Sequence, residues 1–389
     1  MMPIPPPMLS PDDPFWLRHR EAFPALGRFT YLNSASIQPL PRPVAEKLHA
    51  FVECACTGDP DALYDPGIPA RLRASFAQWL GCGADDLALV SSTSDGLIKA
   101  VNAVRWCAGD EIVIPHNEFP SVTYPFKIAV ADGARLVFAG APGRPVTEAD
   151  ILEAVTPRTR ACAFSWVSFS TGYRLDLDRL PRDLKAVGVE LVFVDGMQGA
   201  GVWEPKLSQR EVDFFSFQAV KWIAGPNGIG ALYLRPGLRD TLRNRSLGWY
   251  SVPCCEDYSL LTDPHLVPFP TARQWDGGTP PWIPMVGVQA YFDLLAPAGP
   301  SGVAARMGSL MDVLASKLDA AGIATLVPLR GDNRSSITLL ELEESEGAHA
   351  RLKAANILTA FRMGRVRVSP HVYNGPEDFD RLIGVLQAM

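Results

Sequence analysis

The sequence has neither a long hydrophobic run nor a cluster of basic residues. No apolar stretch approaches the ~20 residues that a membrane-spanning helix requires. The proline-rich start, MMPIPPPMLSPDDPF, lacks the basic region and the apolar region of a secretory signal peptide. The formal net charge is -6, and no run of Lys or Arg is long enough to neutralise a nucleic-acid backbone. We therefore expect a cytoplasmic protein with neither a membrane nor a nucleic acid as its partner.

Metal and nicotinamide motifs are also missing. The seven cysteines are odd in number, and Cys54 with Cys56 and Cys254 with Cys255 do not have the C-x-x-C spacing of a structural zinc site. No H-E-x-x-H occurs. The segment GPNGIG (225–230) is not a G-x-G-x-x-G fingerprint, and it precedes an expected strand instead of following one. We expect reduced thiols, no bound metal and no nicotinamide site.

The composition and the strand pattern are typical of an α/β enzyme. The chain contains 389 residues, of which 47% are hydrophobic and 20% charged, which suits two or three packed domains. Most of its short β-rich runs are apolar throughout, as in a sheet that helices cover on both faces. We expect a mostly parallel sheet of seven strands, sandwiched by helices, with strands within residues 87–92, 111–115, 134–139, 161–167, 191–196, 213–218 and 230–236.

The flanking regions follow a helical pattern. Helices are expected over 15–23, 44–58 and 68–81, the last ending at Gly81. Beyond residue 285 the pattern predicts a smaller α+β domain, with helices over 286–295, 303–322, 349–358 and 377–389 and strands over 335–342 and 364–369. The expected division is an N-terminal arm (1–30) that belongs to the small domain, a large α/β domain (31–285) and the small C-terminal domain (286–389).

Two charged residues follow strands of the expected parallel sheet, at the edge where ligands of such sheets gather. Asp195 comes directly after the apolar run 191–194, and Lys221 follows the next strand in FQAVKWIAGPNGIG. A lysine flanked by apolar residues can have its pKa lowered by desolvation and act as a Schiff-base nucleophile. A buried carboxylate that keeps a pyridinium nitrogen protonated is its complement at a pyridoxal phosphate site. A simple ion pair between the two residues, or two separately solvated side chains, fits the spacing as well.

The sequence around these two residues resembles a known enzyme family. The stretch from DGMQGAG (195–201) to DFFSFQAVKWIAGPNGIGALYLRP (213–236) is similar to class V aminotransferases, which include cysteine desulfurases, kynureninases and isopenicillin N epimerase-like proteins. Further similar motifs, in chain order, are YLNSASIQPLPRPV, SSTSDGLIKAVN, HNEFPSVTYPF, SFSTGYRLDL, DGGTPPW and GRVRVSPHVYNGPEDFDRL. The resemblance implies the fold type I of pyridoxal phosphate enzymes and the cofactor pyridoxal 5′-phosphate.

The resemblance also implies cofactor contacts. Lys221 is expected to form the internal aldimine, Asp195 to pair with the pyridine nitrogen, and Gln198 to lie near the phenolic oxygen of the ring. Thr93 and Ser94, in SSTSDG, match residues that hold the cofactor phosphate at the start of a helix, where backbone N–H groups favour an anion. An ordinary helix N-cap is the alternative for these two residues.

Further matches concern ring stacking, the substrate and a second subunit. Phe119 matches the aromatic residue that stacks on the cofactor ring in kynureninase-like relatives, with a core phenylalanine as the alternative. Thr279, in DGGTPPW, matches the residue that reaches the cofactor phosphate of the partner subunit, which implies a homodimer. Arg367 matches the arginine that binds the substrate α-carboxylate, a task suited to a bidentate guanidinium, with a surface arginine on an edge strand as the alternative. Asn33 and Ser36 are expected on the substrate side.

The sequence departs from the family pattern near the lysine and near the C-terminus. Val220 stands where relatives often have histidine or tyrosine, and Gln218 replaces a serine, so we expect fewer phosphate contacts there, with Gln218 as a substitute donor. Phe169 stands where desulfurases have asparagine. Desulfurases also need a cysteine shortly before the carboxylate-binding arginine, and no cysteine follows Cys255. A persulfide mechanism is therefore disfavoured.

These assignments imply a pyridoxal phosphate enzyme that acts on an α-amino acid. The incoming substrate would free Lys221, which would then become the general base at the substrate Cα. We expect amino transfer, with a kynureninase-like or C–S lyase, or an epimerase, as alternatives and a cysteine desulfurase behind them. A cofactor-binding scaffold protein without catalysis, and an α/β protein with an unrelated ligand, are the remaining interpretations.

Overall fold

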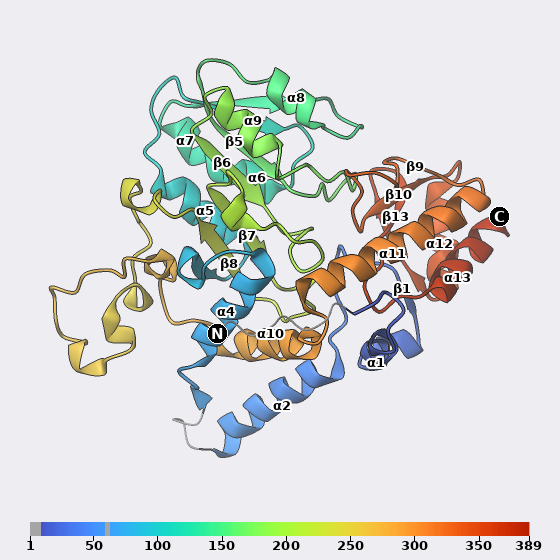
Figure 1. The fold of residues 1–389 in the computed structure, drawn as a ribbon, viewed down its shortest axis with the longest axis horizontal. Helices are drawn as coiled ribbons and strands as arrows, with labels where there is room; N and C mark the ends of the chain where they lie inside the picture. Colours follow the sequence, from blue (N-terminus) through green and yellow to red (C-terminus); the bar gives the residue numbers. More distant parts are fainter. Residues whose placement is uncertain (1–8, 59–62, 389) are drawn as a thin grey trace.

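The computed structural model describes residues 9–58 and 63–388, so the first residues of the expected N-terminal arm lie outside the described part of the chain. Its centre is one seven-stranded sheet in the order β2-β8-β7-β6-β5-β3-β4 (Figure 1). Strand β8 pairs antiparallel with β2 and β7, and the other pairs are parallel. The mostly parallel sheet and all seven expected strands are therefore confirmed: β2 (Leu87–Val90), β3 (Glu111–Pro115), β4 (Arg135–Ala139), β5 (Thr159–Ser165), β6 (Leu191–Asp195), β7 (Phe214–Gln218) and β8 (Gly230–Leu234).

Helices cover both faces of this sheet because its strands are apolar on both sides. In β6, Val192 and Val194 join one hydrophobic cluster, whereas Leu191 and Phe193 join the other, as the alternation of side chains along a strand requires. The first cluster includes side chains of α2 (Arg42–Thr57), α4 (Ile68–Leu80), α8 (Glu148–Glu153), α9 (Leu180–Ala186) and α10 (Trp282–Leu295). The second includes side chains of α5 (Thr93–Ala103), α6 (Pro120–Thr123) and α7 (Lys127–Ala131).

The C-terminal part forms the expected smaller α+β unit, seen on the right of Figure 1. Its four-stranded antiparallel sheet has the order β12-β13-β10-β9, with β9 (Ala324–Thr325), β10 (Thr338–Glu341), β12 (Ala360–Arg362) and β13 (Arg365–Val368). Its helices are α11 (Gly299–Ala320), α12 (Ser345–Ala354) and α13 (Pro376–Gln387). The division of the chain at residues 30 and 285 stays a prediction.

Two helix ends illustrate how local backbone geometry sets the elements. Gly81 has a φ of 64° and ends α4 where the sequence predicts. The helix expected over 349–358 is too long, because α12 ends at Ala354 and Asn356 takes a left-handed φ of 58°. The chain then forms β11 (Ile357–Leu358), which pairs in parallel with β1 (Thr30–Tyr31).

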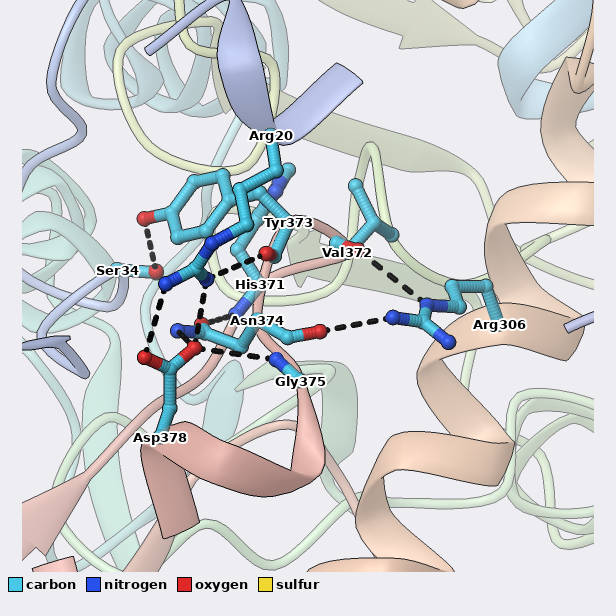
Figure 2. A network of polar contacts seen from close by, with 9 residues as sticks. All are labelled: Arg20, Ser34, Arg306, His371, Val372, Tyr373, Asn374, Gly375 and Asp378. Atoms are coloured by element: carbon cyan, nitrogen blue, oxygen red, sulfur yellow. Dashed lines mark hydrogen bonds and ion pairs between the residues drawn. The ribbon is translucent and has the colours of Figure 1, made fainter. Parts of the chain in front are cut away.

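The N-terminal segment packs against the C-terminal unit through a partly buried ion pair, in which the carboxylate is the buried partner. Helix α1 (Phe15–Glu21) carries Arg20, whose Nη1 and Nη2 donate to the two carboxylate oxygens of Asp378 at 2.7 and 3.1 Å (Figure 2). Asp378 also accepts hydrogen bonds from Asn374 Nδ2 and the Gly375 N–H group, at 2.8 and 3.0 Å. These contacts fix the turn that follows β13, and this turn carries His371.

Candidate active site

A cavity of about 420 Å³ opens at the carboxyl ends of β6 and β7, where a mostly parallel sheet places its ligands. The start of α5 and the hairpin of β12 and β13 also contribute to its wall. The cavity brings together residues that lie far apart in the sequence. Those of its lining residues that the sequence predicts are Ser36, Thr93, Ser94, Phe119, Asp195, Gln198, Gln218, Lys221 and Arg367.

Asp195 ends the buried strand β6 and is itself only 5% exposed. Its Oδ1 accepts a hydrogen bond from the Met197 N–H group at 2.8 Å, and no residue in the described ranges donates one to Oδ2. Burial raises the pKa of this carboxyl to about 6, against the lowering effects of the Met197 N–H group and of the Lys221 charge. Asp195 is therefore mostly ionised at neutral pH and has one oxygen available for a cationic donor in the cavity.

Lys221 lies in the loop between β7 and β8. Burial lowers the pKa of its amine to about 8, a net result in which the Asp195 charge acts against the shift and the charges of Arg367 and Arg362 add to it. The amine is therefore much closer to its neutral, nucleophilic form at physiological pH than an exposed lysine is. Within the described residues Lys221 and Asp195 form no ion pair, although both line the same cavity. The simple ion pair that the spacing also allows is thus not observed.

The residues next to Lys221 are held by buried hydrogen bonds. The Trp222 indole donates to Gln198 Oε1 at 3.0 Å, and Gln198 Nε2 donates to the Ala35 carbonyl at 3.1 Å. His371 Nε2 lies 3.0 Å from the Trp222 carbonyl, which can only accept, so this nitrogen carries the proton. The amide of Gln198, which lines the cavity, is therefore held in one orientation by these two hydrogen bonds. Its expected position near the phenolic oxygen of the cofactor ring stays a prediction.

The start of α5 forms a polar end of the cavity. Ser92, not Thr93 or Ser94, is the N-cap, because its Oγ accepts from the Asp95 N–H group at 3.0 Å. Thr93 and Ser94 are the first helical residues, where backbone N–H groups have no partner within the helix. Ser94 Oγ lies 2.7 Å from Ser121 Oγ, and Gln218 also lines this part of the wall. This set of donors at a helix start suits a phosphate group.

Arg367 lies on β13, which is flanked by β12 and β10 and is therefore not an edge strand. The residue is 2% exposed, and its two terminal nitrogens donate to the Phe169 carbonyl at 3.0 Å and to Ser36 Oγ at 2.7 Å. Burial lowers the pKa of the guanidinium to about 10, and Arg362 contributes to the shift. Asn33 does not line the cavity; its Oδ1 accepts from Ser36 Oγ at 2.8 Å and so orients that hydroxyl.

Two aromatic residues line the cavity, and one predicted residue lies outside it. Phe119 is 45% exposed and meets Phe169 edge to face, with ring centroids 5.2 Å apart, so it is not a core phenylalanine. Thr279 lines a different cavity of about 210 Å³, together with Lys99 and Asp95. Its expected reach to the cofactor phosphate of a partner subunit stays a prediction.

Three functional candidates were not found from the sequence. Arg362 lines the cavity from the end of β12, and Ser165 lines it from the end of β5. Behind Ser165 lies Glu118, whose Oε1 accepts from the Ser165 N–H group at 2.6 Å and whose pKa burial raises to about 7. Ser165 pairs with Asp195 in the register of β5 and β6. Its place at the end of an apolar strand, like that of Asp195, is the signal in the sequence that indicates a residue of the site.

The comparisons with known proteins agree with this geometry. The sequence profile described as "Aminotransferase class-V" matches residues 67–382, well over half of the chain. The chain is a member of the class-V aminotransferase family. It is 27% identical over 389 residues to the isopenicillin N epimerase of Streptomyces clavuligerus, covering 92% of this chain and 94% of that protein. It is 29% identical over 398 residues to a probable cysteine desulfurase of Pseudomonas putida, covering 94% of this chain and 96% of the relative.

A solved structure extends the similarity to the whole fold. The cysteine desulfurase CsdA from Escherichia coli superposes with a TM-score of 0.79 at 22% identity, covering 98% of each chain. Class-V aminotransferases are fold type I pyridoxal phosphate enzymes, so the family, the fold type and the cofactor expected from the sequence are confirmed.

Other kinds of site receive no support from the described residues. In residues 9–58 and 63–388, no three His, Cys, Asp or Glu side chains are grouped so that they could hold a metal ion. None of the helices there is both long and apolar enough to cross a bilayer. The seven cysteines are all free, and none of them lines the cavity described above.

Proposed function

We propose that this class-V enzyme transfers the amino group of an α-amino acid. The observation that carries the proposal is that Lys221, Asp195 and Arg367 line a single cavity, each in a state that suits its role. Lys221 has a lowered pKa and no ion-pair partner in the described chain, Asp195 is buried with a free oxygen, and Arg367 is buried without a carboxylate partner.

The residues present fit pyridoxal phosphate. The hydroxyl groups and N–H groups of Thr93 and Ser94, with Gln218, would hold its phosphate, and the free oxygen of Asp195 would accept a hydrogen bond from its protonated ring nitrogen. Phe119 would stack on the ring, and Gln198 would face it from the Trp222 side. When bound, the cofactor supplies an aldehyde that condenses with amines and a ring that takes up the electrons of a cleaved bond at Cα.

The protein side chains divide the remaining work. Arg367 binds the substrate α-carboxylate through its fork of N–H donors, which fixes Cα over the site. Lys221 Nζ would take the proton from Cα and, for amino transfer, would deliver it to the former aldehyde carbon of the bound cofactor, because its lowered pKa suits a general base near neutral pH. Arg367 is buried and Lys221 is half-buried, and the restricted access of water strengthens these charge interactions.

The choice of amino transfer is supported by the set of bases in the cavity. Among the described lining residues, Lys221 is the one amine, and the lining contains no histidine, cysteine, tyrosine or glutamate. A single base suits proton movement on one face of the substrate. Persulfide chemistry has no thiol to use, which argues against a desulfurase.

An epimerase is the second candidate, because the chain is 27% identical to isopenicillin N epimerase over 92% of its length. Inversion at Cα needs proton delivery to both faces, and the described lining offers Lys221 as its one amine. Asp195 is assigned to the ring nitrogen and the two arginines to anions, so hydroxyl and amide groups are what remains for the opposite face. A homodimer belongs to the same proposal, with Thr279 of one subunit completing the phosphate site of the other.

One experiment separates these activities. The purified protein is incubated with pyridoxal phosphate, its visible spectrum is recorded, and a sample is reduced with borohydride and digested. We expect the pyridoxyl label on Lys221; a label that is missing or on another lysine contradicts the proposal. The loaded protein is then given L-amino acids with a 2-oxo acid acceptor. A new 2-oxo acid supports amino transfer, whereas the D-enantiomer indicates an epimerase and a released side-chain fragment indicates a lyase.

A further inference from the structure

The hairpin of β12 and β13 presents three arginines on one face. Its two-residue loop, Met363–Gly364, has φ values of 50° and 73°, as the tight turns that join antiparallel strands require. The register pairs Arg362 with Arg365 and places Arg367 two residues further along β13. Residues opposite each other in an antiparallel pair, and residues two apart in a strand, point to the same face, so all three side chains leave the hairpin on one side.

These arginines differ in what neutralises them. Arg365 pairs with Glu341 of β10 at 3.2 Å. Arg362 and Arg367 both line the cavity, and within residues 9–58 and 63–388 neither forms an ion pair with a carboxylate. Arg362 donates to the neighbouring Phe361 carbonyl at 2.8 Å, which leaves its other N–H groups available. The acidic residues Glu343, Glu344 and Glu346 line a separate cavity, together with Phe361 and Gly364 of the hairpin.

The charges in the cavity do not balance for a neutral amino acid. The lining carries three basic side chains, Lys221, Arg362 and Arg367, and one carboxylate, Asp195. The α-carboxylate of a substrate would neutralise Arg367, and the cofactor phosphate belongs to the donors at the start of α5. One guanidinium, Arg362, is then left without an anion. An unneutralised arginine beside a buried arginine is repelled by it and gains most from a bound anion.

Arg362 belongs to the substrate side of the cavity and not to the phosphate side. It lies on the strand paired with β13, and Arg367 of that strand contacts Ser36 and the Phe169 carbonyl. The phosphate side is built instead from α5, with Ser94 bonded to Ser121. Phe119 and Phe169 line the same cavity and provide an apolar wall for the methylene groups of a side chain.

We propose that Arg362 binds a second anionic group of the substrate, so that the enzyme acts on α-amino acids whose side chains end in a carboxylate. This inference rests on the proposed function, in which Arg367 binds the α-carboxylate. The planar guanidinium of Arg362 forms two parallel hydrogen bonds with the distal carboxylate, and its exposure at the cavity wall leaves it accessible to the entering substrate.

The test compares acids with their amides, which have nearly the same shape. Loaded wild-type protein is titrated with L-glutamate and L-glutamine, and with L-aspartate and L-asparagine, and the change in the visible spectrum gives each dissociation constant. We expect the acid of at least one pair to bind about tenfold more tightly than its amide, a difference of about 1.4 kcal/mol. Equal binding within both pairs, or tighter binding of both amides, would overturn the inference while leaving the proposed function intact.

Variants then locate the preference. Arg362→Gln should abolish the acid-over-amide preference, taken as the ratio of the two dissociation constants, and Arg362→Lys should retain part of it. Arg365→Gln, on the same hairpin but paired with Glu341, is the matched control and should keep the preference. A preference that survives Arg362→Gln contradicts the inference.

Two further outcomes are decisive. The cofactor-free protein should bind pyridoxal phosphate equally well with Arg362 or Gln at this position. A large loss of cofactor affinity in Arg362→Gln would mean that Arg362 holds the phosphate, which overturns the inference. If no amino acid changes the spectrum of the unreduced, loaded protein, although a parallel sample reduced with borohydride carries the pyridoxyl label on Lys221, the proposed function fails, and the inference fails with it.

Discussion

His371 Nε2 donates a hydrogen bond to the carbonyl oxygen of Trp222 at 3.0 Å, and Trp222 directly follows Lys221. The two rings also stack, with centroids 6.0 Å apart and an interplanar angle of 17°. Burial lowers the pKa of His371 to about 4, so it is a neutral donor at physiological pH. A residue from the C-terminal unit thus holds the loop that carries the candidate catalytic lysine.

His371→Leu should weaken both the fold and the placement of Lys221. It leaves a buried carbonyl without its donor, which costs about 1–3 kcal/mol in the free energy of unfolding. We also expect a smaller fraction of Lys221 to carry the pyridoxyl label after borohydride reduction. His371→Gln retains an N–H donor. Compared with His371→Leu, it should recover more of the labelling of Lys221 than of the free energy of unfolding. His349→Leu, on α12 and outside the cavity, should leave the labelling unchanged; a loss there would show that the effect is not specific to the loop.

The lowered pKa of Lys221 makes the stability of the cofactor-free protein depend on pH. Between pH 8 and 10.5 the unfolded chain holds a proton on this amine that the folded chain has released, so the free energy of unfolding rises with pH in this window. The rise attributable to Lys221 between pH 8 and pH 10 is about 2 kcal/mol. We expect Lys221→Met to remove it, as measured by urea unfolding at pH 8 and pH 10. Parallel curves for the two proteins would show that burial does not depress this pKa.

The ion pair between Arg20 and Asp378 (Figure 2) should contribute far more stability than the exposed ion pair that Asp380, on the same helix α13 as Asp378, forms with Lys317. The Asp378 side chain is 3% exposed and accepts four hydrogen bonds, so Asp378→Asn leaves Arg20 without its counter-charge and should cost about 3 kcal/mol. Asp380, also on α13, is 64% exposed in its pair with Lys317, and Asp380→Asn should cost less than about 1 kcal/mol. Urea denaturation of the two variants measures the difference, and equal losses would contradict it.

The sequence was most informative where one local rule decides the structure. Apolar runs predict all seven strands, and Asp195 at the end of such a run predicts a buried acid at the ligand-binding edge of the sheet. The antiparallel placement of β8 between β2 and β7 depends on contacts between distant segments, which the runs themselves do not encode. The end of α12 had a local signal that was missed, because Asn356 is a residue type that adopts the left-handed conformation.

Arg362 shows why part of the site was beyond the sequence. It lies in a short hairpin with arginines at 362, 365 and 367, and nothing in that spacing tells which of them is neutralised. Glu341 of β10 pairs with Arg365 only because the strands align in one register. The same holds for Asn33, which matches the motif but contacts the cavity only through Ser36. Residue types could be predicted, whereas their partners required the fold.

Thr279 offers a test of the proposed homodimer that does not depend on knowing the substrate. It lies outside the cavity that holds Lys221, so Thr279→Ala should weaken pyridoxal phosphate binding only if a partner subunit brings the hydroxyl to the phosphate. Lys221→Ala should lose activity by about 10²–10⁴-fold, the range for a general base.

When the two variants are unfolded together and refolded as an equal mixture, half of the dimers are mixed, and each mixed dimer has one site with both native residues. At limiting cofactor concentration, the amount of Lys221 that carries the pyridoxyl label should then be about a quarter of the amount in the wild-type protein. If the mixture only averages the two separate variants, each subunit builds its site alone, and Thr279 serves its own chain.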